Sequence, residues 1–596
     1  MNHTSTYSDS LSGPPAPTIV VVGGVAGGMS AAARLARLLP FAHVVVFEAS
    51  SQVSYANCGL PYFIGDVILD EADLILQTPT SLSLRFGLDV RVSTRVTSID
   101  PEQKTVSFSS GNAGGVLSYD YLVLSPGATP IVPPIVGSDL ALTLRTVEDA
   151  RLISLAAKVS RHALIIGAGF VGLELAENLV GLGLRVTIVE ASDQILAPLD
   201  PEMAHLVQRE LVSNGVDLRL GSTVTSIFPD RVLLDSGEYI PADLVISAIG
   251  VRPDSSLAVA ANLELGPSGA IATDEYSCTS NPYVYAIGDA AEKIDSFGAP
   301  SLIALANLAN AAGRRVADHI ADDWISRSRV SPVTNPVYDM SPHQPTSDLA
   351  TSILRVFGLV AGTTGLNEKT LIWRNIPYLA IHTHPQDHAG YFPGATSMAI
   401  KLLVDPSTHL ILGAQIVGQN GVDKRIDVIS TAISAGLVAP KLADLALAYA
   451  PEFSSAKDPI NMLGYIAENR LSGRSFSVAL KDLPNLLEAG YTLLDVRTRE
   501  EYAAGHIPGA LNIPVDDLRA YELTLPDKIV VYCRVGARAH TAAMYLSHPS
   551  PSDPTTRARS IFNLDGGYLT YLSSPHLQLR SPAPSSSTPE LIVTKR

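Results

Sequence analysis

Runs of apolar residues alternate with glycine-rich turns along the first half of the chain. The run Thr18–Val22 leads into Gly23 and Gly24, an alanine-rich stretch follows over residues 30–39, and a second apolar run ends at Glu48. A buried strand, a glycine turn and a helix in this order are typical of the unit that binds a dinucleotide in α/β proteins. The pattern predicts such a unit at the start of the chain.

The same pattern returns from residue 163. Residues 163–166 are apolar, a glycine turn spans 167–172, a helix-like stretch runs to Leu182, and the next apolar run ends at Glu190. An internal repeat of this kind predicts two copies of one structural unit. We therefore expect an α/β fold with two Rossmann-like dinucleotide-binding domains.

The second half of the chain has a different pattern. Strand-like stretches at 397–403 and 410–415 precede helices after Asp423 and Pro440, which predicts an α+β domain. A Ser-Gly break at 472–473 is followed by a compact βαβ-like tail. The chain is therefore expected to contain a third and a fourth domain, the last one of the α/β class.

Composition and charge narrow the function classes. The chain has 596 residues, and 42 Lys and Arg against 58 Asp and Glu give a formal net charge of −16, which argues against nucleic acid as a partner. The first 17 residues contain no Lys or Arg, unlike a secretory or transit peptide. No apolar run reaches the roughly 18 residues that span a membrane. We expect a cytoplasmic protein with no membrane partner.

The first glycine turn has the residue types that cradle a pyrophosphate, because glycines let the backbone approach it and the following helix start favours its charge. The third position of the turn is Val25, where the full fingerprint has glycine. The carboxylate of Glu48 suits an adenosine ribose. The predicted cradle positions are Gly23, Gly24, Ala26 and Gly27.

The second glycine turn matches the full spacing, with Gly167, Gly169 and Gly172. Glu190 ends the next strand, and a carboxylate there accepts the 2′-hydroxyl of an adenosine ribose and repels a 2′-phosphate. No Lys or Arg follows within 191–195 to bind such a phosphate. The sequence favours NADH as the nucleotide and leaves NADPH open.

The cysteines define the chemistry. They lie far apart in sequence, which argues against a disulfide scaffold and for a reducing compartment. Cys58 lies between the two glycine turns, and the positions five residues away on either side are Val53 and Phe63, so no second thiol is close in sequence. Its reaction partner must therefore come from outside the chain. We interpret Cys278 as a small core residue.

These motifs together resemble those of the coenzyme A disulfide reductases in the pyridine nucleotide-disulfide oxidoreductase superfamily. The similarity is greatest to the form fused to a rhodanese domain, also described as coenzyme A persulfide or polysulfide reductases. It covers roughly residues 17–580 and implies FAD, with Gly127 and Asp289 in the distal flavin motifs, and a homodimer. The motifs that carry it are Gly23–Gly28, Ser54–Tyr62, Gly167–Gly172, Thr279–Asp289 and Tyr449–Pro459.

The resemblance also implies a set of site residues. It makes Cys58 the redox thiol, placed beside the flavin. Tyr391 and Tyr449 match tyrosines that reach the thiol from the partner subunit, where a phenol can protonate a departing thiolate. Glu452 replaces a proline of the family pattern after Tyr449. The implied substrate-binding residues are Ser54, Asn57, Arg34 and Arg37; for the two arginines, a solvated helix face is the alternative.

A second cysteine motif lies near the end of the chain. Cys533 and Arg538 enclose a loop, Cys-x4-Arg, that follows a predicted strand and resembles the rhodanese active loop. Backbone N–H groups of such a loop converge on the sulfur and stabilise a thiolate or persulfide. Related phosphatases have one more residue in this loop, so the spacing favours sulfur over phosphate. The joint interpretation is sulfane-sulfur transfer at Cys533 and reduction at Cys58.

The predicted function is thus reduction of coenzyme A disulfide, coenzyme A persulfide or polysulfide, with sulfur transfer by the last domain and no metal. The predicted domains are 17–150 with 271–325 for FAD, 151–270 for NAD, a linker at 326–350, 351–470 for dimerisation, 474–580 as the rhodanese domain, and a disordered tail at 581–596.

Three alternatives stay open. A flavin NADH oxidase or peroxidase would use a lone cysteine as a sulfenic acid, although the related peroxidases carry a histidine where this chain has Ala26. A specialised disulfide or persulfide reductase of secondary metabolism would keep the same motifs. A non-reductive sulfur carrier would need no Glu190, so the intact second glycine turn argues against it.

Overall fold

The computed structural model describes residues 16–328, 348–521, 525–548 and 559–574. The chain divides into two compact units, the first formed by residues up to 191 and 221–350 and the second by 192–220 and the residues from 351 onward. Among the described helices, none combines the length and the apolar character that crossing a membrane would require. The predicted tail at 581–596 and most of the predicted linker lie outside the described residues.

The first unit starts with a parallel sheet in which β1 is central. Consecutive residues of β1 point to opposite faces, so Val21 packs into one core cluster and Val20 into the other. Burial of both faces explains the continuous apolar runs of the sequence. The strand order is β19 (Val284–Ala286), β7 (Tyr121–Leu124), β1 (Thr18–Val22), β2 (His43–Phe47) and β3 (Asp89–Arg91).

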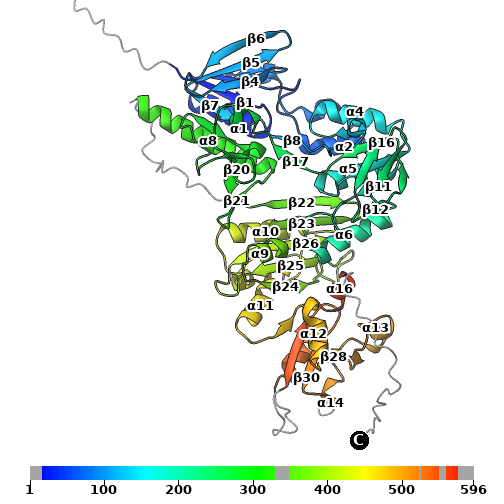
Figure 1. The fold of residues 1–596 in the computed structure, drawn as a ribbon. Helices are drawn as coiled ribbons and strands as arrows, with labels where there is room; N and C mark the ends of the chain where they lie inside the picture. The colour runs from blue at the N-terminus through cyan, green and yellow to red at the C-terminus, as the bar shows by residue number, and fades with distance from the viewer. Residues whose placement is uncertain (1–15, 329–347, 522–524, 549–558, 575–596) are drawn as a thin grey trace, which may run out of the picture. The chain divides into compact units, whose positions relative to one another are not determined.

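Two different layers cover this sheet. The helices α1 (Ala26–Leu38) and α8 (Ala306–Ser328) pack side by side on one face (Figure 1). The apolar face of α8 continues through Ile320 and Trp324, and the helix ends at Ser328. It therefore extends into the start of the segment that the sequence predicts to be a linker. The other face is covered by the antiparallel strands β4 (Arg95–Asp100), β5 (Thr105–Ser110) and β6 (Ala113–Ser118).

The same architecture returns in the second part of the first unit, which confirms the predicted repeat. Here α5 (Phe170–Gly181) follows the second glycine turn and α4 (Val147–Ala157) precedes β10. The second parallel sheet of this unit includes, side by side, β11 (Arg185–Val189), β10 (His162–Ile166), β16 (Leu244–Ser247) and β9 (Leu142–Thr143). The antiparallel layer consists of β13 (Val224–Ile227), β14 (Arg231–Leu234) and β15 (Tyr239–Pro241).

The second unit contains the predicted α+β domain. Its antiparallel sheet packs with α10 (Val422–Ser434) and α11 (Pro459–Leu471) around one core cluster, and α6 (Pro201–Ser213) contacts the strands β22, β23 and β26. The strand order is β22 (Thr351–Val356), β23 (Leu359–Gly365), β26 (Ile411–Gly418), β25 (Ala399–Val404) and β24 (Leu379–Thr383), so β24 is an edge strand.

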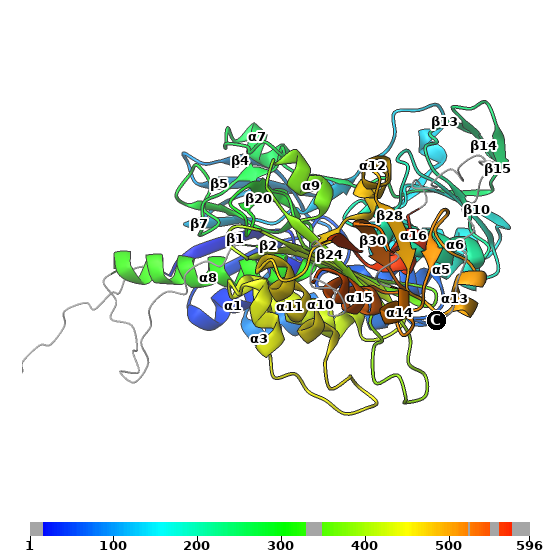
Figure 2. The same cartoon turned by 90° about the horizontal axis from the view of Figure 1, so that it is seen from below.

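The predicted βαβ-like tail is a second, parallel sheet in the same unit. Figure 2 shows α15 (Ala537–Leu546) beside the central strand β30, and both contribute to one core cluster. The strand order is β27 (Ser477–Val478), β31 (Ser560–Leu564), β30 (Lys528–Tyr532), β28 (Thr492–Asp495) and β29 (Leu511–Asn512). The flanking helices include α12 (Leu483–Glu488), α13 (Arg499–Ala503), α14 (Leu518–Tyr521) and α16 (Gly567–Leu572).

Candidate functional site

Cys58 lies on a short 3-10 helix, Asn57–Gly59, that leads into α2 (Leu60–Ile64). The segment starts beside the first glycine turn, where the backbone N–H of Ser54 donates a hydrogen bond to the carbonyl oxygen of Gly24 at 2.9 Å. The fold thus brings the predicted thiol segment and the predicted flavin turn together, although Ser54 and Gly24 are 30 positions apart in sequence.

The surroundings of Cys58 favour its protonated form. The residue is exposed and free, yet the protein around its sulfur desolvates it, and this raises the pKa of the Cys58 thiol. The carboxylates of Glu174 and Asp289 raise the pKa further. Because only the thiolate is a nucleophile, a proton acceptor or a nearby positive group is needed to activate Cys58.

The neighbour of the thiol has an unmatched polar atom. The Oδ1 atom of Asn57 is buried and accepts no hydrogen bond from any residue that the structure describes. Buried acceptors are almost always paired. The side chain of Asn57 therefore fits a bound cofactor or substrate that carries a donor next to Cys58.

Glu174 is a site residue that the sequence analysis did not single out. It lies on α5, between the fully buried Leu173 and Leu175. Burial raises the pKa of Glu174 to about 7, and the charge of Glu177 adds to this effect. A carboxyl group with this pKa near Cys58 can exchange protons at neutral pH. The available signal was a lone acidic residue within the apolar start of the second dinucleotide helix.

The first glycine turn has the geometry of a pyrophosphate cradle. Gly23 has a φ of 99°, and a Cβ atom at Gly28 would lie 1.9 Å from the carbonyl oxygen of Gly23, so the close approach requires glycine. The helix α1 begins at Ala26, where its free N–H groups favour an anion. Glu48 accepts a hydrogen bond from the N–H of Gly24 at 2.8 Å, which holds its carboxylate at the turn.

The distal flavin residues also lie together. A guanidinium nitrogen of Arg145 is 3.5 Å from the carboxylate of Asp289. Gly127 has a φ of 79°, and a Cβ atom there would lie 2.3 Å from the guanidinium, so Arg145 reaches Asp289 only past a glycine. Sequence motifs mark Gly127 and Asp289, whereas no motif marks Arg145. Together with the first glycine turn, these residues fit FAD.

The second glycine turn repeats this geometry. A Cβ atom at Gly172 would lie 2.2 Å from the carbonyl oxygen of Gly167, whereas a Cβ atom at Gly169 would have, its local backbone aside, no atom of the described residues within 4 Å. The space at Gly169, at the start of α5, leaves room for a phosphate. Glu190 accepts a hydrogen bond from the N–H of Ala168 at 2.8 Å, as Glu48 does in the first turn. These residues fit a nicotinamide dinucleotide.

The two predicted arginines on α1 have partners within the protein. The Nε atom of Arg34 lies 2.7 Å from Oδ1 of Asp318. The guanidinium of Arg37 lies over the ring of Phe86, 5.5 Å from its centroid. Their contact with phosphates of coenzyme A stays a prediction.

In the second unit, the structure brings the predicted tyrosines together. The hydroxyl oxygens of Tyr391 and Tyr449 are 3.2 Å apart, and 76% and 50% of the two residues are exposed. The buried guanidinium of Arg425 ties their loops, because it donates to the carbonyl oxygen of Asp387 at 2.8 Å and to Asp458 at 2.9 Å. The fold therefore presents two neighbouring phenols on one surface.

The C-terminal domain holds Cys533 at the end of β30. Cys533 is buried, and the N–H of Gly536 donates a hydrogen bond to its sulfur at 3.2 Å. The segment after β31 supports the loop from behind: the N–H of Tyr568 donates to the carbonyl oxygen of Cys533 at 2.8 Å, and that of Leu569 donates to Arg534 at 3.0 Å. One backbone N–H of the loop thus points at the sulfur, and the convergence of several donors that the rhodanese resemblance implies stays a prediction.

Arg538, the last residue of the loop motif, has a partner that the sequence analysis missed. Its two terminal nitrogens lie 2.7 and 2.8 Å from the carboxylate oxygens of Glu501 on α13. The hydrogen bond from Arg538 lowers the pKa of Glu501 to about 2. The two-point contact fixes the orientation of the guanidinium beside the loop.

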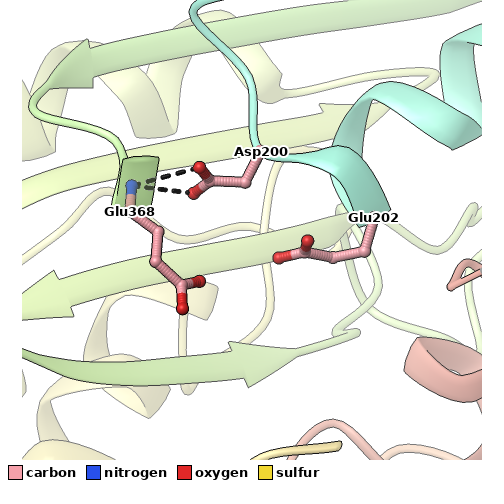
Figure 3. A group of neighbouring side chains, drawn as sticks. All are labelled: Asp200, Glu202 and Glu368. Atoms are coloured by element: carbon pink, nitrogen blue, oxygen red, sulfur yellow. Dashed lines mark hydrogen bonds between the residues drawn. The ribbon is translucent and has the colours of Figure 1, made fainter. Parts of the chain in front are cut away.

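An acidic cluster in the second unit could be taken for a metal site. Carboxylate oxygens of Asp200, Glu202 and Glu368 lie within 4.8 Å of one another (Figure 3). The fully buried ammonium of Lys401, however, lies 2.9 Å from Asp200 and 2.6 Å from each glutamate. A fixed lysine already supplies the positive charge that these carboxylates need, so the cluster is a buried ion network.

Three family profiles match the chain in succession. Residues 17–313 match the pyridine nucleotide-disulphide oxidoreductases, 352–459 match the dimerisation domain of these enzymes, and 479–574 match the rhodanese-like domain. Among curated proteins, coenzyme A disulfide reductase of Staphylococcus aureus (strain JH9) is 33% identical over 458 residues, which is 76% of this chain and 100% of the relative.

Solved structures resemble the chain over nearly its whole length. The reduced CoADR-RHD of Bacillus anthracis is 42% identical with a TM-score of 0.87, covering 94% of this chain and 98% of that one. A NAD-dependent persulfide reductase from A. fulgidus is 33% identical with a TM-score of 0.81, covering 93% and 100%. A water-forming NADH oxidase from Lactobacillus brevis is 26% identical with a TM-score of 0.71, covering 77% and 100%.

Proposed function

Because the chain belongs to the pyridine nucleotide-disulphide oxidoreductases and carries a rhodanese-like domain, we propose that it reduces coenzyme A disulfide, coenzyme A persulfide or polysulfide with NADH and FAD. In this proposal Cys58 is the single redox thiol, and Cys533 accepts and delivers sulfane sulfur. The relatives named for reduction of a coenzyme A disulfide and of a persulfide support this substrate class. The location in the cytoplasm stays a prediction from the sequence.

The observation that carries the proposal is the position of Cys58. It follows the segment anchored on the first glycine turn by the hydrogen bond from Ser54 to Gly24, and all three cysteines of the chain are free. A thiol beside a flavin cradle without a second thiol must form its disulfide with a guest molecule. The unmatched Oδ1 of Asn57 offers that guest, or the flavin, a hydrogen-bond acceptor.

The chemistry of Cys58 follows from these contacts. The Cys58 thiolate attacks one sulfur of the bound disulfide, so a new sulfur–sulfur bond forms while the bond in the substrate breaks and one thiolate leaves. Two electrons must then reach the mixed disulfide to release the second thiol and restore Cys58. FAD, when bound, carries these two electrons from NADH.

Glu174 is suited to manage the proton of Cys58. Burial raises the pKa of Glu174 to about 7, and its carboxylate is near enough to raise the pKa of the thiol. When Cys58 loses its proton, a neutral Glu174 would relieve the repulsion between two anions. We infer that Glu174 exchanges protons with the thiol during turnover.

The proposal specifies NADH rather than NADPH. Glu190 lies at the second glycine turn through its hydrogen bond with Ala168. A carboxylate in this place favours a free ribose 2′-hydroxyl and disfavours a 2′-phosphate.

The proposal also includes a homodimer. The match of 352–459 to a dimerisation domain supports it. The hydroxyls of Tyr391 and Tyr449 are exposed and hydrogen-bonded to each other. In the proposed dimer we expect them to lie against Cys58 of the partner subunit, where a phenol can protonate a departing thiolate.

A second candidate function is an NADH oxidase. The resemblance to a water-forming NADH oxidase over 77% of the chain favours it. In that case Cys58 would be oxidised to a sulfenic acid and not to a mixed disulfide. The C-terminal domain with Cys533 would then have no part in the reaction.

The test is anaerobic turnover with NADH and, separately, coenzyme A disulfide, coenzyme A persulfide and oxidised glutathione. We expect faster turnover with the coenzyme A species and loss of thiol or sulfide release in Cys58→Ser while FAD stays bound. Cys278→Ser is the matched control and should keep full activity. Equal rates on all three substrates would remove the coenzyme A assignment, and NADH consumption that requires oxygen would favour the oxidase.

A further inference from the structure

The edge strand β24 directs two histidines at the C-terminal domain. Because side chains alternate along a strand, His382 and the nearby His384 share one face. Nδ1 of His382 lies 2.6 Å from Oδ2 of Asp565, and Nε2 of His384 lies 2.8 Å from Oγ1 of Thr570. The dimerisation sheet therefore contacts the segment 565–570 at two points.

The carboxylate of Asp565 is held by hydrogen-bond donors from outside its own domain. It is buried, and its Oδ2 atom accepts a second hydrogen bond from the backbone N–H of His382 at 3.0 Å. Its Oδ1 atom lies 3.3 Å from a guanidinium nitrogen of Arg470 on α11. The same nitrogen of Arg470 donates to the carbonyl oxygen of Ala380 on β24 at 2.6 Å. All these donors come from the dimerisation domain.

Asp565 is followed by the turn that supports the sulfur loop. Gly566 and Gly567 both have positive φ, at 66° and 61°. A Cβ atom at Gly567 would lie 2.4 Å from the carbonyl oxygen of Cys533, and one at Gly566 would lie 2.8 Å from Cβ of His382. The backbone therefore passes closely between the Cys533 loop on one side and His382 on the other.

The ring of His382 has a carboxylate at each nitrogen. Nε2 lies 3.0 Å from Oε1 of Glu202, opposite the contact of Nδ1 with Asp565. Only the imidazolium has a proton on both nitrogens, so these two contacts are satisfied together in the charged form. Lys401 contacts the same Oε1 atom of Glu202, and Arg470 contacts the other carboxylate oxygen of Asp565. The imidazolium thus completes a chain of alternating charges.

We propose that His382 is a positioning residue of the sulfur-transfer site, which holds the Asp565–Gly567 turn in place behind the loop of Cys533. The inference depends on the sulfur-transfer activity assigned to Cys533 above. It adds that a residue of the dimerisation domain controls the geometry of the rhodanese loop. The C-terminal domain then depends on its neighbour for full activity.

The test uses the full-length holoenzyme, with thiosulfate as sulfur donor and cyanide as acceptor. The Cys533 thiolate attacks the outer sulfur of thiosulfate, a sulfur–sulfur bond to Cys533 forms, and sulfite leaves. Cyanide then takes this sulfur, which forms thiocyanate and restores the thiolate. The variants are His382→Asn, whose amide can replace Nδ1 at Asp565, and His382→Gln, whose amide can replace Nε2 at Glu202. The exposed His548 provides the control variant, His548→Gln.

We expect His382→Gln to lower kcat for thiocyanate formation about tenfold, because the Cys533 loop would be held away from its reactive geometry. His382→Asn should restore most of it, and reduction at Cys58 should change little in either variant. Equal kcat in both variants and the wild type would overturn the inference. A parallel loss of thiocyanate formation and of reduction at Cys58 would also overturn it, because it would indicate misfolding only. A wild-type protein that forms no thiocyanate would instead remove the assigned activity of Cys533, and the inference with it.

Discussion

The ammonium of Lys401 lies 2.6 Å from the Oε1 atom of Glu202, in a part of the structure where the lysine side chain is fully buried. Asp200 and Glu368 surround the same ammonium at 2.9 and 2.6 Å. Burial alone would lower the pKa of Lys401, but the charges of the three carboxylates outweigh it and raise the pKa well above its usual range. One cation is therefore shared by Asp200 and Glu202 at the start of α6 and by Glu368 of α9 (Glu368–Trp373).

Lys401→Met should destabilise the second unit strongly. The substitution keeps the volume but removes the buried cation between Asp200, which is buried, and Glu202 and Glu368, which are partly buried; breaking such a buried pair costs about 3–5 kcal/mol. Urea unfolding, monitored by a signal from the C-terminal half of the chain, measures the change in the free energy of unfolding. Lys441→Met, which removes an exposed ion pair with Asp444, is the control and should change the free energy of unfolding by less than about 1 kcal/mol. A change of that small size in Lys401→Met would contradict the buried-network interpretation.

The stability of the second unit should fall between pH 6.5 and about 9. Burial by itself would lower the pKa of His382, but its hydrogen bonds with Asp565 and Glu202 prevail and raise the pKa to about 9, against the opposing charge of Lys401. A raised pKa means that the contribution is complete below the unfolded value of 6.5 and is lost as the pH rises through 9.

For the largely buried His382, the loss in the free energy of unfolding amounts to roughly 3 kcal/mol. Denaturant unfolding at a series of pH values measures it. Arg470 pairs with Asp565 beside this ring, and burial lowers the pKa of the neighbouring His384 to about 3, so that His384 stays neutral over this pH range. In His382→Asn the decline should disappear; a decline of the same size in that variant would assign it to another group.

Glu174→Gln should make Cys58 more reactive at neutral pH. The substitution removes a negative charge that raises the pKa of the thiol. The fraction of Cys58 present as thiolate should therefore rise, by about threefold for one charge at a partly buried site. The measurement is the rate of iodoacetamide alkylation at Cys58, followed by peptide mass spectrometry.

The control for this experiment is Glu177→Gln. The charge of Glu177 raises the pKa of Glu174, so its removal leaves Glu174 more ionised and should not accelerate alkylation of Cys58. If Glu174 also exchanges protons in turnover, Glu174→Gln should lower kcat for disulfide reduction despite the more reactive thiol. An unchanged alkylation rate would show that the carboxylate does not act on Cys58.

Glu190→Ala should relax the choice of nucleotide. Loss of the carboxylate removes an acceptor for the ribose 2′-hydroxyl and a repulsion against a 2′-phosphate. We expect kcat/KM for NADH to fall and that for NADPH to rise, so that their ratio changes by more than about tenfold. An unaltered ratio would mean that the second glycine turn does not decide nucleotide preference.

Glu501→Gln should impair the sulfur-transfer site. Without the two-point contact, Arg538 loses its fixed orientation, and we expect thiocyanate formation to fall about tenfold. Because the folded-state pKa of Glu501 is lowered, the ion pair contributes stability at neutral pH and loses it as the pH falls below 4.5 towards 2. Glu500→Gln, the adjacent exposed residue, should leave activity unchanged. Equal activities of the two variants would remove the role of Glu501.

Much of the fold was predictable because local patterns determine it. The glycine turns at Gly23 and Gly167 follow buried strands, and such strand–turn–helix units have the same structure in many proteins. The site was only partly predictable. Glu174, Arg145 and Glu501 act through contacts between elements far apart in sequence, and no local spacing marks them.

The sequence by itself determined the two dinucleotide turns, the solitary Cys58 and the Cys533–Arg538 loop, because each is a short motif whose chemistry depends on neighbouring residues. Only the tertiary structure decided which charges meet. It placed Lys401 within the acidic cluster and His382 against Asp565, which is 183 residues away in sequence. Such pairs arise from the packing of one domain on another, and the free energy of a buried charge depends on partners that the linear pattern does not identify.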